Sequence, residues 1–361
     1  MILTHGANSL KRGGGGDSAT WDGSRDYSFY VGKSSPYYIE TPEQYAALCY
    51  ISNGLFSTDE TCPPTITERD LFEGKEVYLK NNLVFNDDYE NNFDWIDLDY
   101  HSGHVNPPAN DCTSLRLQFA GTFHGDFHSL KGFYYHQSES APSWKGPFQY
   151  LNMIRNATIE NLYFENCSLK SFEQGNFALF VCDYRYNQNY FYNVQVRHCR
   201  MVATLKVEGG TGSNPLAYIV EVIGNDLTTY AYMYGCGIVD SDCTFYDYSG
   251  YASYRENGLH LSGNQSNNGA LYNDFNVNVN IHNNQYYWKG YIFIENQDQY
   301  RLNCLYNNVT STGIYPSYVT FDGTLKNSVS ELITAHNAYS DGHSLKLDSE
   351  LRYIPGQLAG T

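Results

Sequence analysis

The sequence predicts an all-β solenoid, in which similar coils stack on one another. An internal repeat is the first observation: the pattern over residues 159–169 returns over residues 191–201, at a constant offset of 191 − 159 = 32 residues. The second is hydrophobic alternation with a period of two, as over residues 115–119, which is typical of half-buried strands. Composition is the third: 35 Tyr, 31 Gly and only 17% charged residues among 361 favour β structure. Because one coil cannot bury its own apolar edge, we expect each repeat to stack on the next.

A short helix is expected over residues 41–53, ahead of the repeats. Thr41 suits the N-cap, Pro42 suits the first helical position, and Gln44 completes a capping box. Gly54 suits the end of the helix. Four residues fall on one helical face: Tyr45, Leu48, Cys49 and Ser52. The helix is therefore predicted to cover the open first coil of the solenoid.

Strands are expected to follow over residues 72–87 and 93–100. Residues 115–135 read as a strand, a tight turn at Gly121 and Gly125, and a second strand. The Cys at one repeat position, Cys167 and Cys199, is predicted to form a buried column of thiols. The repeats are predicted to continue, less regularly, from residue 233 and from residue 302.

The order of these pieces resembles the entry segment of β-helix domains of the GLUG-repeat kind. The helix is followed by F-x-G-K-x-V-x-L from Phe72, by an acidic strand, and by a corner F-x-G-x-x-H-x-L from Phe123. The resemblance covers about residues 39–135 and implies a single right-handed parallel β-helix with a short N-terminal capping helix. It also implies structural roles for His128 and for the acidic strand, which holds Asp94, Asp97 and Asp99. The corner departs from the family's usual F-D-G-N-G-H-x-I at His124, Asp126 and Phe127.

The chain is predicted to have three parts. Residues 1–38 form an extended attachment arm or linker, residues 39–327 the β-helix, and residues 328–361 a C-terminal cap or tail with a short helix over 328–337. The stretch HGANSLKRGG in the arm resembles N-terminal segments of tail or fibre proteins of phages infecting gut Bacteroidetes. That resemblance implies a segment that orders against a partner in the particle; the alternative is a disordered tail.

Charge and cysteine usage restrict the partners. A net charge of −17 argues against binding nucleic acid through its phosphates. No apolar run is long enough for membrane insertion, and the N-terminus carries no secretory signal. The nine Cys are scattered singly, so we expect free buried thiols rather than a metal site. His124 and His128 have only Asp126 as a nearby third ligand, so neither a metal nor a cofactor is expected.

Catalysis has a few acidic candidates, of which Asp240 and Asp242 lie two apart on a predicted strand and can face the same side. Such a pair also serves solubility or a structural cation. The four candidates are Asp240, Asp242, Asp247 and Glu256.

Aromatic residues are the candidates for ligand binding, because Tyr offers a flat apolar face and a polar tip to a sugar ring or a protein surface. The alternatives are stacking between coils and packing between subunits. The ten candidates are Tyr184, Tyr186, Tyr190, Tyr246, Tyr248, Tyr251, Tyr254, Tyr286, Tyr287 and Trp288.

The predicted function is a non-enzymatic structural virion protein of a phage, in a tail or head fibre or spike. Assembly in the host cytoplasm and release by lysis would reconcile the β-rich body with the absence of an export signal. The protein is expected to anchor to other virion proteins through residues 1–38, to form a homotrimer, and to present its aromatic surface to a host surface glycan or a partner. The alternatives are a β-helical polysaccharide depolymerase, either glycosidase or lyase, and an extracellular bacterial adhesin.

Overall fold

Strands dominate the computed structural model of this protein. The structure describes residues 16–87, 112, 115, 117–136, 151–153, 157–172, 177–183, 188–206, 219–223, 230–248, 258–262, 271–284, 290–292, 300–313, 319–321 and 324–361. Side chains are described over residues 16–87, 112, 115, 117–134, 157–168, 190–200, 234–242 and 324–361.

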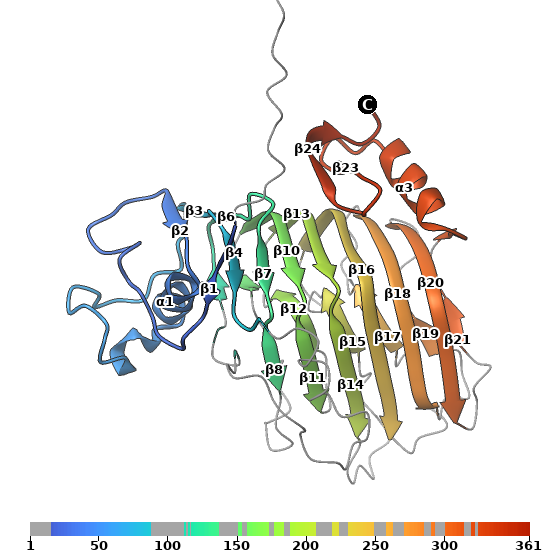
Figure 1. The fold of residues 1–361 in the computed structure, drawn as a ribbon, viewed down its shortest axis with the longest axis horizontal. Helices are drawn as coiled ribbons and strands as arrows, with labels where there is room; N and C mark the ends of the chain where they lie inside the picture. The colour runs from blue at the N-terminus through green and yellow to red at the C-terminus, as the bar shows by residue number, and fades with distance from the viewer. Residues whose placement is uncertain are drawn as a thin grey trace, which may run out of the picture.

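Among these residues, fifteen strands form one large parallel sheet that curves into a half-barrel (Figure 1). Its strands are β1 (Asp17–Thr20), β2 (Tyr37–Ile39), β3 (Glu76–Leu79), β4 (Asn82–Val84), β6 (Thr122–His124), β7 (Ser129–Lys131), β8 (Tyr134–His136), β10 (Thr158–Glu165), β11 (Ser168–Phe172), β13 (Gln188–Arg197), β14 (Arg200–Lys206), β16 (Tyr230–Tyr248), β18 (Leu271–Asn284), β20 (Tyr300–Gly313) and β22 (Thr324–Leu325).

Smaller sheets complete the strand inventory of the described chain. One holds the five parallel strands β5 (Leu117–Phe119), β9 (Leu151–Met153), β12 (Phe177–Asp183), β15 (Ile219–Ile223) and β17 (Gly258–Ser262). Two others are pairs: β19 (Gly290–Ile292) with β21 (Val319–Phe321), and the antiparallel β23 (Leu345–Leu347) with β24 (Tyr353–Leu358).

The predicted fold class, an all-β single right-handed parallel β-helix, is wrong. The described chain mixes strands with helices, and its large sheet opens as a half-barrel instead of forming a clear solenoid. The helices are α1 (Pro42–Asn53), the short 3₁₀ helix η1 (Leu55–Thr58) and α3 (Val329–Ala338). A repeat pattern determines which strands lie side by side, but the closure of coils depends on the connections between strands, and these do not repeat in this sequence.

The predicted register of the repeats is confirmed. Ile159 in β10 lies beside Phe191 in β13, as the 32-residue offset requires, and Phe191 lies beside Met233 in β16. The buried column of thiols is also confirmed, because Cys167 and Cys199 are at most 1% exposed. The backbone N–H of Cys167 donates to Cys199 Sγ at 3.3 Å. The six cysteines with described side chains are all free, and five of them are buried.

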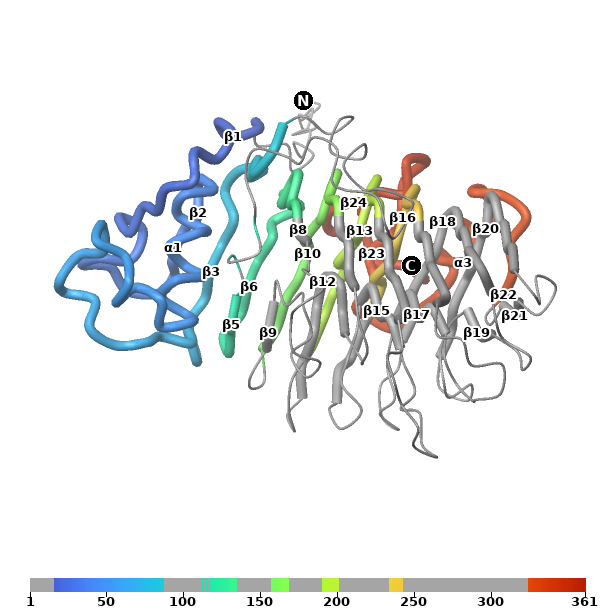
Figure 2. The backbone as a smooth tube through the Cα atoms, turned by 90° about the horizontal axis from the view of Figure 1, so that it is seen from below, coloured from blue at the N-terminus to red at the C-terminus, as the bar shows by residue number. Residues whose placement is uncertain are grey.

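Helix α1 matches the predicted capping helix of residues 41–53. Thr41 Oγ1 accepts the backbone N–H of Gln44 at 3.3 Å, and Gly54 ends the helix with φ of 72°. All four residues of the predicted apolar face are buried. The helix is buried on its other sides as well, because residues 16–38 fold back over it and contribute Trp21 and Tyr27 to the core (Figure 2).

Other predicted elements differ in detail. Residues 72–87 hold two strands, β3 and β4, and residues 115–135 hold four short strands, β5 to β8, the last of which ends at residue 136. The predicted strand over residues 93–100, with its three Asp residues, lies outside the described residues. The predicted helix over residues 328–337 is confirmed as α3, whose N-cap is Ser328. No helix in the described part of the chain is long and apolar enough to cross a membrane.

Candidate functional site

One row of outward-facing side chains runs across the large sheet at a single register position. Each member lies beside the next on neighbouring parallel strands. We call this row the outer column; its members with described side chains are Tyr38, Tyr78, His124, Glu160, Tyr192 and Tyr234. The same register position continues at Tyr272 and Arg301. All six described members are partly or fully exposed, because alternate residues of a strand point away from the core.

The aromatic rings of the outer column stack along it. The rings of Tyr78 and His124 are 4.0 Å apart at an angle of 10°, and those of Tyr192 and Tyr234 are 5.4 Å apart at 11°. Nearly parallel rings at this spacing cover one another's faces, so part of their role is to hold neighbouring strands together. Glu160 interrupts the two stacks, and the ring faces that border it have no aromatic neighbour within the column.

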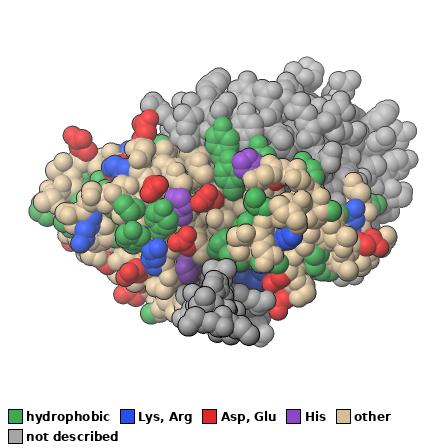
Figure 3. All heavy atoms as spheres, turned by 90° about the horizontal axis from the view of Figure 1, so that it is seen from above, with side chains coloured by type: hydrophobic (Ala, Val, Ile, Leu, Met, Phe, Trp, Pro, Cys, Tyr) green, Lys and Arg blue, Asp and Glu red, His purple; other side chains and the backbone are tan. Residues whose placement is uncertain are grey.

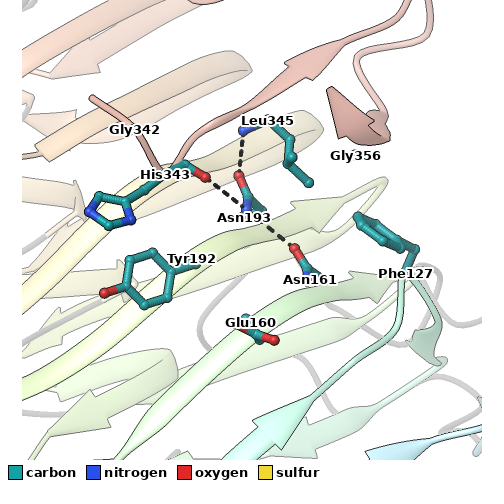
Figure 4. A pocket seen from close by; sticks show the side chains of 9 residues that line it. All are labelled: Phe127, Glu160, Asn161, Tyr192, Asn193, Gly342, His343, Leu345 and Gly356. Atoms are coloured by element: carbon teal, nitrogen blue, oxygen red, sulfur yellow. Dashed lines mark hydrogen bonds between the residues drawn. The ribbon is translucent and has the colours of Figure 1, made fainter. Parts of the chain in front are cut away.

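A cleft of about 570 Å³ opens at this interruption. Figure 4 shows Phe127 and Tyr192 on opposite sides of Glu160 and Asn161. Strands in a sheet are about 4.8 Å apart, so side chains two strands away from each other are separated by about 9.6 Å. In the outer column that separation lies between His124 and Tyr192, and the smaller, non-aromatic side chain of Glu160 occupies the interval. The lining residues are Phe127, Glu160, Asn161, Tyr192, Asn193, Gly342, His343, Leu345 and Gly356.

Backbone geometry holds Phe127 at the wall of the cleft. Asp126 and Phe127 both adopt left-handed conformations, with φ of 50° and 63°. Bulky residues rarely do so, and the conformation costs about 1 kcal/mol or more. The N–H groups of Gly125 and Phe127 donate to Glu160 O and Asn161 O, each at 2.8 Å. Strained backbone that its surroundings enforce is common at functional sites.

Two asparagines connect the strands that form the floor of the cleft to the C-terminal segment, residues 341–358, that forms its roof. Asn161 and Asn193 occupy equivalent left-handed positions, with φ of 54° and 55°, and Asn193 Nδ2 donates to Asn161 Oδ1 at 3.2 Å. Asn193 Oδ1 accepts the N–H of Leu345 at 2.9 Å, and its Nδ2 donates to His343 O at 3.4 Å. The repeat therefore supplies the groups that bind the C-terminal segment above the cleft.

The roof belongs to that C-terminal segment, residues 341–358. The ring of His343 lies 5.1 Å from that of Tyr192 and 4.7 Å from that of Tyr234. Tyr353 stacks on Tyr163 at 5.7 Å. These contacts place His343 over the second aromatic stack of the outer column (Figure 4).

A buried ionic network also holds the C-terminal segment. Arg197, only 2% exposed, donates to the carbonyls of Glu350 at 2.8 Å and Leu351 at 2.9 Å. Arg352 pairs with Glu165, whose other oxygen accepts from Ser129 Oγ at 2.7 Å. Burial raises the pKa of Glu165, but Arg352 and Ser129 outweigh it, so its pKa lies below the ordinary value.

Polar atoms surround the cleft floor. Glu160 Oε1 lies 2.6 Å from His124 Nδ1, and His124 Nε2 is buried without a hydrogen-bond partner among the described residues. Burial raises the pKa of Tyr192 to about 12, with further contributions from neighbouring Tyr residues and Glu160. Tyr192 therefore stays protonated near neutral pH and can donate a hydrogen bond. Figure 3 shows hydrophobic, His, basic and acidic side chains together over the N-terminal part of this face.

The arrangement suits binding better than hydrolysis. Hydrolysis of a glycosidic bond commonly uses two carboxyl groups on either side of it. Among the described lining residues, Glu160 is the only carboxylate. The described chain also contains no group of three His, Cys, Asp or Glu side chains that could hold a metal ion.

The predicted acidic candidates do not meet in this cleft. Asp240 is exposed, Asp242 is half-buried, and Ser241 between them is buried. Asp240 has φ of 47° and lines a second cavity of about 370 Å³ with Arg197 and Arg352. Asp247 lies further along β16, and Glu256 lies outside the described residues.

Of the ten predicted ligand-binding aromatic residues, Tyr190 is the one whose side chain the structure describes. Its ring is 6.1 Å from that of Tyr192 and nearly parallel to it. Tyr246 and Tyr248 lie in the second half of β16, beside Thr204 and Lys206 of β14. The remaining seven lie outside the described residues: Tyr184, Tyr186, Tyr251, Tyr254, Tyr286, Tyr287 and Trp288.

None of the nine lining residues was a predicted site residue, and the four whose larger side chains shape the cleft are Phe127, Glu160, Tyr192 and His343. The repeat held a signal for two of them, because the offset of 32 residues places Tyr192 beside Glu160. The departures of His124, Asp126 and Phe127 from the family corner were a second signal. Nothing in the sequence indicates that His343 covers this site.

Comparison with known proteins adds no relative. No protein-family model, no curated protein and no solved structure matches the chain.

Proposed function

We propose that the protein binds a glycan without cleaving it, and that one sugar ring enters the cleft at Glu160. The observation that carries this proposal is the cleft at the interruption of the outer column, which Tyr192, Phe127 and a single carboxylate, Glu160, line together. A ligand held there meets two aromatic side chains and a polar floor. Sugar rings have apolar faces and a rim of hydroxyl groups, so this combination matches them.

The cleft contains both hydrogen-bond donors and hydrogen-bond acceptors, which suits a ligand that carries several hydroxyl groups. Glu160 accepts, Tyr192 donates, and the Asn161 amide can donate, because its described hydrogen bond uses only the oxygen. Each of these groups comes from a strand of the large sheet, whereas the roof comes from the C-terminal segment. The floor is therefore positioned by regular structure, which favours specific binding.

The proposed setting is a phage particle. The arm resemblance supports a fibre or spike protein that is assembled in the host cytoplasm and joined to other virion proteins through residues 1–38. Within this arm, the residues from 16 onwards form β1 and begin β2, both of which belong to the large sheet. A homotrimer, which would multiply weak single-site binding by avidity, belongs to the same proposal. The ligand would then be a glycan on the host surface.

The test is glycan binding by the purified full chain. The protein is screened on an array of bacterial surface oligosaccharides, and hits are measured by titration calorimetry. Tyr192→Leu and Phe127→Leu should each weaken binding about tenfold, which corresponds to the loss of roughly 1.4 kcal/mol of aromatic contact. Tyr38→Leu is the matched control, because Tyr38 belongs to the outer column, is 46% exposed and does not line the cleft.

Two results would reject the proposal. One is an array without any hit; the other is a hit whose affinity falls equally in the Tyr38 variant and in the two cleft variants. Thermal melting of each variant separates lost binding from lost folding.

Glycan cleavage is the second candidate, and the hydrogen bond between His124 and Glu160 favours it, since such pairs perform acid–base chemistry. The same oligosaccharides, incubated with the protein, should release no new reducing ends on our proposal. Release that disappears in Glu160→Gln would establish the enzyme instead.

A further inference from the structure

We infer that Glu160 makes the cleft selective for sugar rings that carry no carboxylate, so that neutral hexoses enter and uronic acids are excluded. The inference rests on the proposed function, because it specifies the ligand class of the same cleft. It makes Glu160 responsible for discriminating between charged and neutral sugars. The aromatic side chains cannot do this, since their ring faces bind both kinds of sugar.

The position of Glu160 is the first argument. Its side chain is 30% exposed, so the carboxylate reaches the cleft without being fully hydrated. Oε1 is engaged by His124 Nδ1 at 2.6 Å. Oε2 has no hydrogen-bond partner among the described residues and is available to accept from a ligand hydroxyl.

The neighbouring charges are the second argument. Lys80 pairs with Asp126 of the corner at 3.4 Å. Arg197 and Arg352 are both engaged with Glu165 on the same sheet face. The described lining of the cleft contains neither Lys nor Arg, and the whole chain carries a net charge of −17. The described lining of the cleft therefore offers no lysine or arginine to compensate a second negative charge, and the imidazole of His124 is already engaged with Glu160.

The consequence follows from electrostatics. Two like charges about 4 Å apart near a protein surface repel strongly enough to change affinity more than tenfold. A uronic acid differs from its neutral hexose only by a carboxylate in place of a hydroxymethyl group. The hexose can donate hydroxyl hydrogen bonds to Oε2, whereas a ring with its carboxylate near Glu160 is repelled.

The experiment compares wild type, Glu160→Gln and a matched control, Asp126→Asn. Asp126 carries the same charge, lies on the turn beside Phe127 and does not line the cleft. Asn is a suitable replacement there because it tolerates left-handed backbone. The probes are oligosaccharide pairs with the same linkage, one built of glucose and one of glucuronate, and the pair chosen is the one whose neutral member binds wild type.

We expect wild type to bind the neutral member at least tenfold more tightly than the uronate. Glu160→Gln should raise uronate affinity about tenfold, while its affinity for the neutral sugar changes only a few-fold. Asp126→Asn should keep the wild-type preference. Uronate binding that is equal to neutral binding in wild type, or that is unchanged in Glu160→Gln, overturns the inference while the proposed function stands.

A salt titration keeps the inference testable if Glu160→Gln does not fold. Raising the ionic strength from about 0.05 M to about 1 M shortens the Debye length to about 3 Å. The affinity of wild type for the uronate should then rise towards that for the neutral sugar, and a constant ratio would contradict the inference. A wild-type protein that binds neither class refutes the proposed function itself.

Discussion

Replacing Arg197 by Met should release the C-terminal segment from the sheet. Arg197 is 2% exposed and donates to Leu351 O at 2.9 Å, Glu350 O at 2.8 Å and Gln195 Oε1 at 3.0 Å. Its Nε lies 3.7 Å from Glu165 Oε1. Met fills similar space but donates no hydrogen bond. The segment would therefore lose the two charged hydrogen bonds that Arg197 donates to its backbone carbonyls.

The size of the effect follows from these contacts. Removing one partner of a buried charge pair costs about 3–5 kcal/mol, because the other charge remains buried. Glu165 keeps Arg352 and Ser129 as partners in the variant. We therefore expect the lower end of the range, about 3 kcal/mol, which corresponds to a roughly 100-fold change in the docking equilibrium.

Hydrogen exchange measures this directly. The amides of Leu345 and Ala359 are protected by bonds to Asn193 Oδ1 at 2.9 Å and Ser344 O at 2.8 Å. Their exchange should speed up about 100-fold in Arg197→Met, while amides in β10 keep their protection. Affinity for the cleft ligand should fall as well, because the roof is released.

The control is Lys346→Met on the same segment. Lys346 Nζ donates to Thr361 O at 2.6 Å on the surface, and such exposed substitutions change stability by less than about 0.5 kcal/mol. Unchanged exchange of Leu345 and Ala359 in Arg197→Met would show that Arg197 does not hold the C-terminal segment on the sheet. Equal loss of protection across β10 would also contradict the prediction, because the segment would then not be a separable unit.

Three further predictions concern the body of the protein. The pKa of Glu165 is lowered in the folded protein, so its stabilising contribution is present at neutral pH and is lost as the pH falls below 4.5, the ordinary pKa of a Glu side chain. The free energy of unfolding, measured with urea, should therefore be smaller at a pH below 4.5 than at pH 7, and equal values would contradict this prediction. Gly125→Ala should destabilise by about 1–3 kcal/mol, because its new Cβ would lie 2.4 Å from Asn161 O, whereas Gly16→Ala, with nothing within 4 Å, should be neutral. Thr41→Ala removes the N-cap of α1 and should cost about 1 kcal/mol in thermal or urea unfolding; no change would show that the cap is dispensable.

The register of the sheet could be predicted from the sequence only where the repeat is regular. Between β10 and β13 the offset is constant, so Glu160 and Tyr192 could have been placed side by side from the pattern alone. Between β6 and β10 the spacing becomes 160 − 124 = 36 residues, and between β3 and β6 it becomes 124 − 78 = 46 residues. Loops of unequal length conceal the outer column from any search at a fixed period.

Whether the large sheet closes into a solenoid could not be predicted from the sequence, for a related reason. Alternation shows which side chains point inwards, and the α1 capping signals are local, so both were predicted correctly. Whether the sheet closes depends on long connections that carry neither repeat nor alternation. The C-terminal roof depends on pairs far apart in sequence, such as Asn193 with His343, 150 residues away, and no local pattern marks such a pair.

The ten candidate ligand-binding residues were chosen by the density of Tyr in the sequence, and seven of them lie outside the described residues. A search for Tyr-rich stretches selects loops with several Tyr residues, whereas the proposed cleft is lined by two separate aromatic residues, Phe127 and Tyr192, and by Glu160. Tyr190 was selected, but its neighbour Tyr192 lines the cleft. What distinguishes Tyr192 is its neighbour on the next strand, Glu160, and that information comes from register.

The most direct measurement is a crystal structure of the protein with an oligosaccharide that the array identifies. We expect one sugar ring between Phe127 and Tyr192, with a hydroxyl group donating to Glu160. A sugar bound instead at residues 246–254 or 286–288, with none between Phe127 and Tyr192, would contradict it.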